Sequence, residues 1–271
     1  MMIERHKMKI SHELPLSLMN KGYEWNDYDY LLPIFLDRYE QYKLYFQKAR
    51  KDNRFIIMDN SLFEGYTHTT EDLLEKINLI KPNIFIVPDV WNNTAITLKN
   101  AKEWIKNYKQ DGVEFMAVLQ GETFGELKTC YKELVKLGYT HIAFNHSSIA
   151  YQTLTINNST LSKQMLGRWY LINSLEESGV LDKDNYHHLL GCSLPQEIKL
   201  YKHKYEFLNS IDTSNPILLG AEGVRYEDGG IDWKPTEKLE HYFEKDLDNR
   251  LEDIIFNVNK FKEWISYNEV R

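Results

Sequence analysis

Four polar residues directly follow apolar runs, at points where a buried strand would end. Asp59 follows FIIM, Asp89 follows IFIVP, Gln120 follows MAVL and Asp212 follows LNSI. In a barrel of parallel strands the C-terminal ends open on one mouth, so residues distant in sequence meet around one ligand. A pair of carboxylates there suits glycosyl transfer, in which one attacks the anomeric carbon and the other handles the leaving group's proton. A single strand-end aspartate is as often a helix cap, so the prediction depends on the set.

Other chemistries find less support in the residues. A metal held by these carboxylates would take His12, His68 or His146 as nitrogen ligands. The Ser-His-Glu end of the first expected strand lacks the paired histidines of such a site, so we expect no metal and no cofactor. His187 and His188 open an expected strand at the end of a barrel that serves stability, so we interpret both as structural. The chain has no glycine-rich phosphate loop and no G-x-S-x-G motif.

Apolar runs alternate with stretches of helical period along the chain. The expected strands are 8–14, 29–36, 54–59, 83–89, 114–120, 140–145, 186–192 and 207–212. The expected helices are 38–50, 70–79, 95–108, 124–137, 166–178, 196–205 and a closing helix at 251–267. Thr123 with Glu126 has the pattern of a helix start, and Gly138 that of a helix stop.

This alternation predicts an α/β fold, a single (β/α)8 TIM barrel formed by one domain over residues 1–271. An open, doubly wound sheet is the structural alternative. The stretch 220–250 carries glycine, proline and many charges, and we expect it to be an excursion after the eighth strand.

Composition limits the partners. With 33 basic and 40 acidic residues the net charge is −7, which argues against a surface that holds nucleic acid mainly by counterion release. No apolar run is long enough to cross a membrane and the N-terminus has no signal-like apolar segment, so we expect a cytoplasmic protein without membrane contact. Cys130 and Cys192 lie in apolar runs and are interpreted as buried thiols. The 18 tyrosines and 6 tryptophans suggest a surface for a partner protein or a homo-oligomer.

Five segments between residues 55 and 216 resemble, in order, the tRNA-guanine transglycosylase superfamily. They are MDNSLFEG, IFIVPDV, FMAVLQGETFGELKTCYKELVKLGYTHIAF, HHLLGCSLPQEIKLY and FLNSIDTSNP. The resemblance includes the short DNA-modifying, phage-type members, which insert 7-deazaguanines into DNA. For a phage-encoded protein the cytoplasm would be that of the host.

The resemblance implies a role for each strand-end residue. Asp212 matches the covalent nucleophile and Asp59 the aspartate that transfers the base's proton. Asp89 matches the residue that hydrogen-bonds the purine edge, while Gln120 and Gly121 match the base-reading amide and glycine.

Two apolar matches would cover the faces of the base. Phe63 matches the stacking aromatic and Leu190 the apolar residue on the opposite face. Asn145 and His146 replace the family's glycine pair, which changes the donors available to the incoming base.

The family's zinc motif, C-x-C-x-x-C with a following histidine, is missing, so we expect no zinc subdomain. The arginine usual after the nucleophile is also missing, which leaves Lys163, Arg168 and Arg225 as candidates for phosphate contacts. The resemblance implies replacement of guanine in nucleic acid by a 7-deazaguanine-type base, in DNA rather than tRNA. The alternatives are tRNA as acceptor, a glycosyl hydrolase or transferase of free nucleosides or nucleotides, and a non-catalytic purine-binding barrel.

Overall fold

Eight parallel strands form a nearly closed (β/α)8 barrel, which confirms the predicted fold. The structure is a computed structural model that describes residues 8–156, 159–192, 194–201 and 207–266. The strands are β1 (Lys9–His12), β2 (Asp29–Leu31), β3 (Ile56–Met58), β4 (Ile84–Ile86), β5 (Glu114–Val118), β6 (His141–Asn145), β7 (Tyr186–Leu190) and β8 (Leu208–Thr213). Their order is β1-β8-β7-β6-β5-β4-β3-β2, and each neighbouring pair is parallel.

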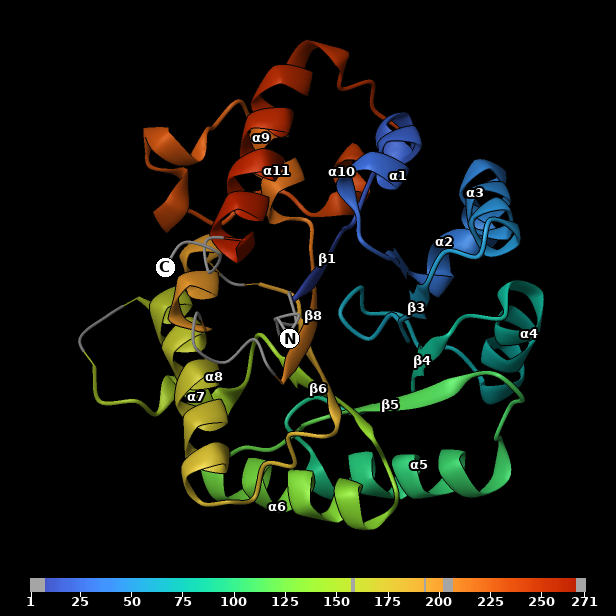
Figure 1. Cartoon of the computed structure of the whole chain (residues 1–271), viewed down its shortest axis with the longest axis vertical. Helices are drawn as coiled ribbons and strands as arrows, with labels where there is room; N and C mark the ends of the chain where they lie inside the picture. The colour runs from blue at the N-terminus through green and yellow to red at the C-terminus, as the bar shows by residue number, and fades with distance from the viewer. Residues whose placement is uncertain (1–7, 157–158, 193, 202–206, 267–271) are drawn as a thin grey trace, which may run out of the picture.

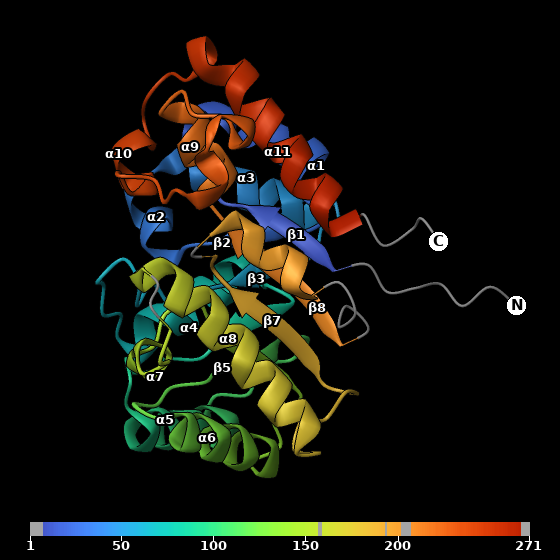
Figure 2. The same cartoon turned by 90° about the vertical axis from the view of Figure 1, so that its left-hand side faces the viewer.

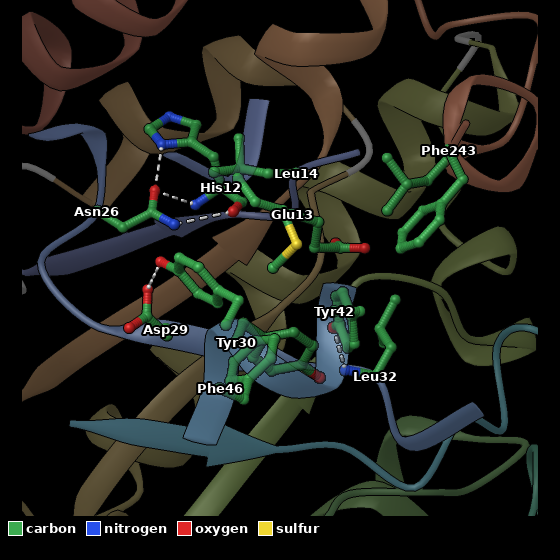
Figure 3. Close-up of a pocket in the computed structure, with 13 residues that line it drawn as sticks. His12, Glu13, Leu14, Asn26, Asp29, Tyr30, Leu32, Tyr42, Phe46 and Phe243 are labelled. Atoms are coloured by element: carbon green, nitrogen blue, oxygen red, sulfur yellow. Dashed lines mark hydrogen bonds between the residues drawn. The ribbon is translucent and has the colours of Figure 1, made fainter. Parts of the chain in front are cut away.

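The barrel's seam lies between β1 and β2, which form no ladder with each other in the described part of the chain. Side chains satisfy the backbone of β1 there instead. Asp27 accepts from the amide of Ile10 (3.0 Å), and Asn26 both accepts from the amide of His12 (2.8 Å) and donates to its carbonyl (3.0 Å) (Figure 3). A cavity of about 20 Å³ remains at the seam, enough for about one water molecule.

Helices surround the strands, as Figure 1 shows, with α5 and α6 below them and α9 and α11 above. The α-helices are α1 (Gly22–Trp25), α2 (Pro33–Arg38), α3 (Glu40–Lys51), α4 (Thr70–Ile80), α5 (Thr94–Asn107), α6 (Phe124–Lys136), α7 (Ile149–Gln152), α8 (Thr160–Glu177), α9 (Asn215–Ala221), α10 (Leu239–Tyr242) and α11 (Leu251–Ser266). The 3-10 helices are η1 (Leu16–Lys21), η2 (Pro195–Tyr201), η3 (Tyr226–Asp228), η4 (Gly230–Asp232) and η5 (Asp248–Arg250). The predicted capping box of Thr123 and Glu126 starts α6.

Three element predictions were wrong in part. The strand expected at 29–36 ends at Leu31, because Pro33 begins α2, where its missing N–H costs nothing. The helix expected at 38–50 starts at Glu40, since Tyr39 is extended and separates α2 from α3. The helix expected at 196–205 is the 3-10 helix η2 as far as Tyr201, and residues 202–206 lie outside the described residues.

The excursion expected at 220–250 consists of short helical pieces after α9, and α10 lies at the same end of the barrel as α2 and α7 (Figure 2). In the described residues, no helix combines the length and apolar character needed to cross a membrane.

Candidate active site

The strand-end residues singled out in the sequence converge on one cavity of about 320 Å³. Its lining takes side chains from the ends of six consecutive strands: Asp59 after β3, Asp89 after β4, Gln120 after β5, Asn145 on β6, Leu190 on β7 and Asp212 on β8. Phe63 and His146, from the loops after β3 and β6, also line it. The structure thus brings together all but one of the predicted site residues.

Asp212 is buried and held by two donors on one carboxylate oxygen. His188 Nε2 lies 2.8 Å from its Oδ1, and the amide of Gly191 donates to the same atom at 3.0 Å. With its proton on Nε2, His188 accepts at Nδ1 from the hydroxyl of Ser210 (2.8 Å), which in turn accepts from Tyr186 (2.8 Å). This chain of donors fixes the orientation of the Asp212 carboxyl.

His188 holds a carboxyl of the candidate site, a contact that its interpretation as structural did not foresee. It projects into the barrel, where its ring stacks on Tyr30 of β2 at 5.9 Å between centroids. The neighbouring His187 points the other way and contacts Tyr131 (3.0 Å), as expected of a structural histidine. Strand alternation separates the two, since His188 shares a face with Leu190.

Glu13 is a second carboxyl beside Asp212 and follows the end of β1. Burial, and then the charges of Asp212, Glu64 and Asp59, raise the pKa of Glu13 well above its usual range. The charge of Asp212 acts on the Glu13 carboxyl, so the protonated form of Glu13 is favoured beside it.

Asp59 and Glu64 complete the acidic part of the lining. Burial, followed by the charges of Glu64, Asp212 and Asp89, raises the pKa of Asp59 well above its usual range. Burial also raises the pKa of Glu64 to about 7, and its Oε2 is buried without a hydrogen-bond partner in the described part of the chain. These shifts favour the protonated forms of the two carboxyls, and a protonated carboxyl is what general acid catalysis requires.

An amide and carboxylate network forms the opposite part of the lining. Asp89 accepts from Asn60 Nδ2 on Oδ1 (2.8 Å) and from Gln120 Nε2 on Oδ2 (2.6 Å). Gln120 Oε1 in turn accepts from Asn145 Nδ2 (3.2 Å). Asp89, Gln120 and Asn145 leave capacity for a ligand, because a carboxylate accepts about four hydrogen bonds and an amide nitrogen donates two. Asn60 Nδ2 has no donor left, since it also donates to the carbonyl of Val87 (3.1 Å). The network can present donors and acceptors to a planar heterocycle.

Aromatic side chains border the same cavity. Phe63 is 45% exposed and Trp91 36%, which is unusual for residues of this size, and both line the cavity. The Phe63 ring lies 5.3 Å from that of His146. Burial, and then the charges of Arg168 and Lys234, lower the pKa of His146 to about 3, so this ring is uncharged at neutral pH. Exposed aromatic faces beside hydrogen-bonding groups suit a flat ligand.

Gly121 is the predicted site residue that does not line the cavity. Its carbonyl accepts from Ser148 Oγ (3.0 Å), and a Cβ at this position would lie 2.9 Å from Cβ of Glu126 and 3.0 Å from the amide of Leu127. The glycine is required here because the chain packs closely against the start of α6.

Two of the expected phosphate contacts are engaged elsewhere. Arg168 is 0% exposed and forms an ion pair with Glu197 (2.7 Å), so its interpretation as a phosphate contact was wrong. Arg225 pairs with Glu252 and Asp253 on α11. Lys163 donates to the carbonyl of Gln152 (3.2 Å).

The comparisons with known proteins bear on the fold. No family model matches the chain, and no curated protein matches it. Among the matching solved structures is the YdjI aldolase from Escherichia coli K12, with a TM-score of 0.54, 11% sequence identity, and coverage of 98% of this chain and 92% of that chain. Such a likeness shows the barrel fold alone.

Within the described residues, no group of three or more histidine, cysteine, aspartate or glutamate side chains has the geometry to hold a metal.

Sequence reasoning missed several cavity residues. The clearest are Glu13, Glu64 and Trp91, together with His188, which lies behind the lining and contacts Asp212. Strand parity could have found His188, because counting back by two from Leu190 places it inside the barrel. Glu13 and Trp91 also follow strand ends. Neither comes directly after an apolar run, so the pattern that marks Asp59, Asp89, Gln120 and Asp212 does not mark them.

Proposed function

We propose that the protein is a base-exchange transglycosylase that replaces guanine in nucleic acid, DNA more than tRNA, by a 7-deazaguanine. The observation that carries the proposal is that Asp59 and Asp212 line one cavity, where the charge of Asp212 helps to raise the pKa of Asp59. Separate locations for these two carboxyls would have excluded the mechanism. The amide network and the exposed aromatic rings in the same cavity support a purine as its ligand.

We assign opposite tasks to the two aspartates, as the resemblance to the transglycosylases implies. Asp212, held by His188 and Gly191, attacks C1′ of the target nucleotide. The bond from C1′ to N9 of guanine breaks, its electron pair stays on N9, and protonated Asp59 supplies the proton that the leaving base takes up. A glycosyl ester of Asp212 remains.

The second half reverses these steps with another base. N9 of the incoming 7-deazaguanine attacks C1′ and loses its proton to the Asp59 carboxylate, while Asp212 leaves as a carboxylate. Two displacements at C1′ give net retention. Glu13, whose pKa is raised by burial and by the charge of Asp212, would offer a proton near the carboxylate that reappears when the ester is cleaved.

The test is mass spectrometry of a guanine-containing oligodeoxynucleotide incubated with protein and a 7-deazaguanine. We expect exchange of the base by wild type, a trapped covalent complex on Asp212, and loss of both in Asp212→Asn. Asp184→Asn, which changes an exposed aspartate away from the cavity, is the matched control. Unchanged exchange by Asp212→Asn would refute the mechanism.

A second candidate is glycosyl transfer or hydrolysis on a free nucleoside or nucleotide. The acidic lining by Glu13, Asp59, Glu64 and Asp212 favours it, since each of these groups that is ionised repels the phosphates of a nucleic-acid backbone. Comparing release of guanine from guanosine with exchange on the oligonucleotide separates the two, because base exchange in nucleic acid predicts no activity on the nucleoside.

A further inference from the structure

Two lysines at the cavity have no ion-pair partner in the described part of the chain. Lys234 and Lys238 both line the cavity and belong to the excursion after β8. The acids nearest in sequence are engaged elsewhere: Glu240 pairs with Arg38 (2.8 Å) and Glu237 lies 3.7 Å from His241. The charge of Lys238 acts to lower the pKa of Glu64, but the two side chains form no ion pair in the described residues.

Both lysines lie beside the aromatic part of the lining. Lys238 Nζ is 5.5 Å from the centroid of the Phe63 ring. The charge of Lys234 acts on His146, whose ring contacts the same Phe63. Partial burial and the charge of Lys238 lower the pKa of Lys234, as expected of two ammonium groups that lack a counter-charge. An anion bound between them would remove this repulsion.

We propose that Lys234 and Lys238 form a phosphate subsite, which holds a phosphate of the nucleotide whose base lies against Phe63. The inference rests on the proposed function for the base and sugar, and on the two lysines for the phosphate. These two lysines take the place of Arg168 and Arg225 as the expected phosphate contacts, because both arginines are engaged in ion pairs. The phosphate is either that of a nucleoside monophosphate or a phosphodiester of nucleic acid.

The experiment measures equilibrium dissociation constants of guanosine, guanosine 5′-monophosphate and a short single-stranded oligodeoxynucleotide containing one guanine. The proteins are wild type, the double variant Lys234→Gln/Lys238→Gln, and the control Lys99→Gln/Lys102→Gln. The control removes two positive charges from exposed positions of α5 and leaves the cavity unchanged.

We expect the Lys234→Gln/Lys238→Gln protein to bind a phosphate-bearing ligand at least about tenfold more weakly, with guanosine affinity within about twofold of wild type. The control should match wild type for all three ligands. For the oligonucleotide, the slope of log K against log salt should become shallower by about 0.7, the contribution of one phosphate contact to a single strand. Loss for the oligonucleotide alone supports the subsite and assigns it to a phosphodiester, whereas loss for the monophosphate as well supports it and assigns it to the target nucleotide's own phosphate.

Failure of the subsite and failure of the proposed function have different signatures. The subsite is overturned if the double variant loses equal affinity for guanosine and for both phosphate ligands. It is also overturned if the double variant loses no affinity for either phosphate ligand. In both cases, binding of guanosine by wild type still supports the base site. If wild type does not bind guanosine but the double variant loses affinity for the phosphate ligands, the subsite stands and the base site is refuted. No binding of any of the three ligands by wild type overturns both.

Discussion

Replacing Arg168 by alanine tests how the barrel holds the chain at the end of β7, beside Asp212. The guanidinium is fully buried, pairs with Glu197 through Nε (2.7 Å) and Nη2 (3.0 Å), and donates to the carbonyls of Phe144 (3.0 Å), Leu190 (3.1 Å) and Gly191 (2.9 Å). It therefore ties the end of β6 to the end of β7. At the end of β7 the guanidinium binds the carbonyl of Gly191, and the amide of the same residue donates a hydrogen bond to Asp212.

The expected cost follows from what the substitution leaves behind. Removing one partner of a buried ion pair costs about 3–5 kcal/mol, because the remaining charge is desolvated and unpaired. For a domain of this size that lowers Tm by roughly 6–15 °C, at roughly 2–3 °C for each kcal/mol. Water that enters the space left by the side chain would bring the loss toward the lower value.

The assay is urea unfolding, combined with activity measured where each variant is folded. Arg168→Met with Glu197→Gln should lose less stability than Arg168→Ala, because no unpaired charge remains. Arg168→Lys should recover part of the stability but little activity, since one ammonium cannot replace the planar set of five contacts. Arg225→Ala, which breaks ion pairs with Glu252 and Asp253 at the surface, should cost much less stability than Arg168→Ala. A loss below about 1 kcal/mol in Arg168→Ala, or a double variant no more stable than the single one, would refute the reasoning.

Three further predictions concern the cavity itself. Gly191→Ala should reduce both stability and base exchange, because Gly191 has a φ of 68° and a Cβ would lie 2.6 Å from Nδ1 of His146. Calorimetry and the exchange assay test this prediction, and a variant with unchanged Tm and activity would contradict it. Glu64 has a folded pKa of about 7, above its ordinary value of 4.5, so its contribution to the free energy of unfolding falls as pH rises between these values. Glu64→Gln should therefore stabilise the protein more at pH 8 than at pH 5 in urea unfolding, and an equal effect at both would show that this carboxyl is not perturbed. Phe63→Ala should weaken guanosine binding about tenfold in a titration if the ring stacks on the base, whereas the same change at the exposed Tyr170 on α8 should leave the affinity unchanged.

The sequence was sufficient for the barrel and for the strand-end residues because both depend on local pattern. Apolar runs mark the strands, and the polar residue after each run marks the mouth. Asp59, Asp89, Gln120 and Asp212 share a cavity for this reason alone. The boundaries were less predictable where one residue changes the chain's direction, as Pro33 does when it ends β2 early.

The missed residues depend on contacts between segments distant in sequence. Arg168 looks like a surface cation on a helix of mixed polarity, and only its pairing with Glu197 of η2 places it inside. Lys234 and Lys238 belong to an excursion whose sequence does not indicate which end of the barrel it covers. No local pattern carries that information, because tertiary packing decides it.

The acidity of the cavity and the proposed anionic substrate are compatible once charge is considered group by group. Glycosyl transfer passes through a transition state with positive charge near C1′, and fixed carboxylates stabilise that charge most where water is excluded. In the proposed complex Asp212 lies nearest that charge, while burial favours the protonated forms of Glu13 and Asp59 and so limits the repulsion before reaction. The proposed phosphate subsite adds the positive charges of Lys234 and Lys238 to the lining of the same cavity. Acidic groups for the reacting sugar and two lysines for the phosphate make the proposed nucleotide substrate compatible with a net charge of −7.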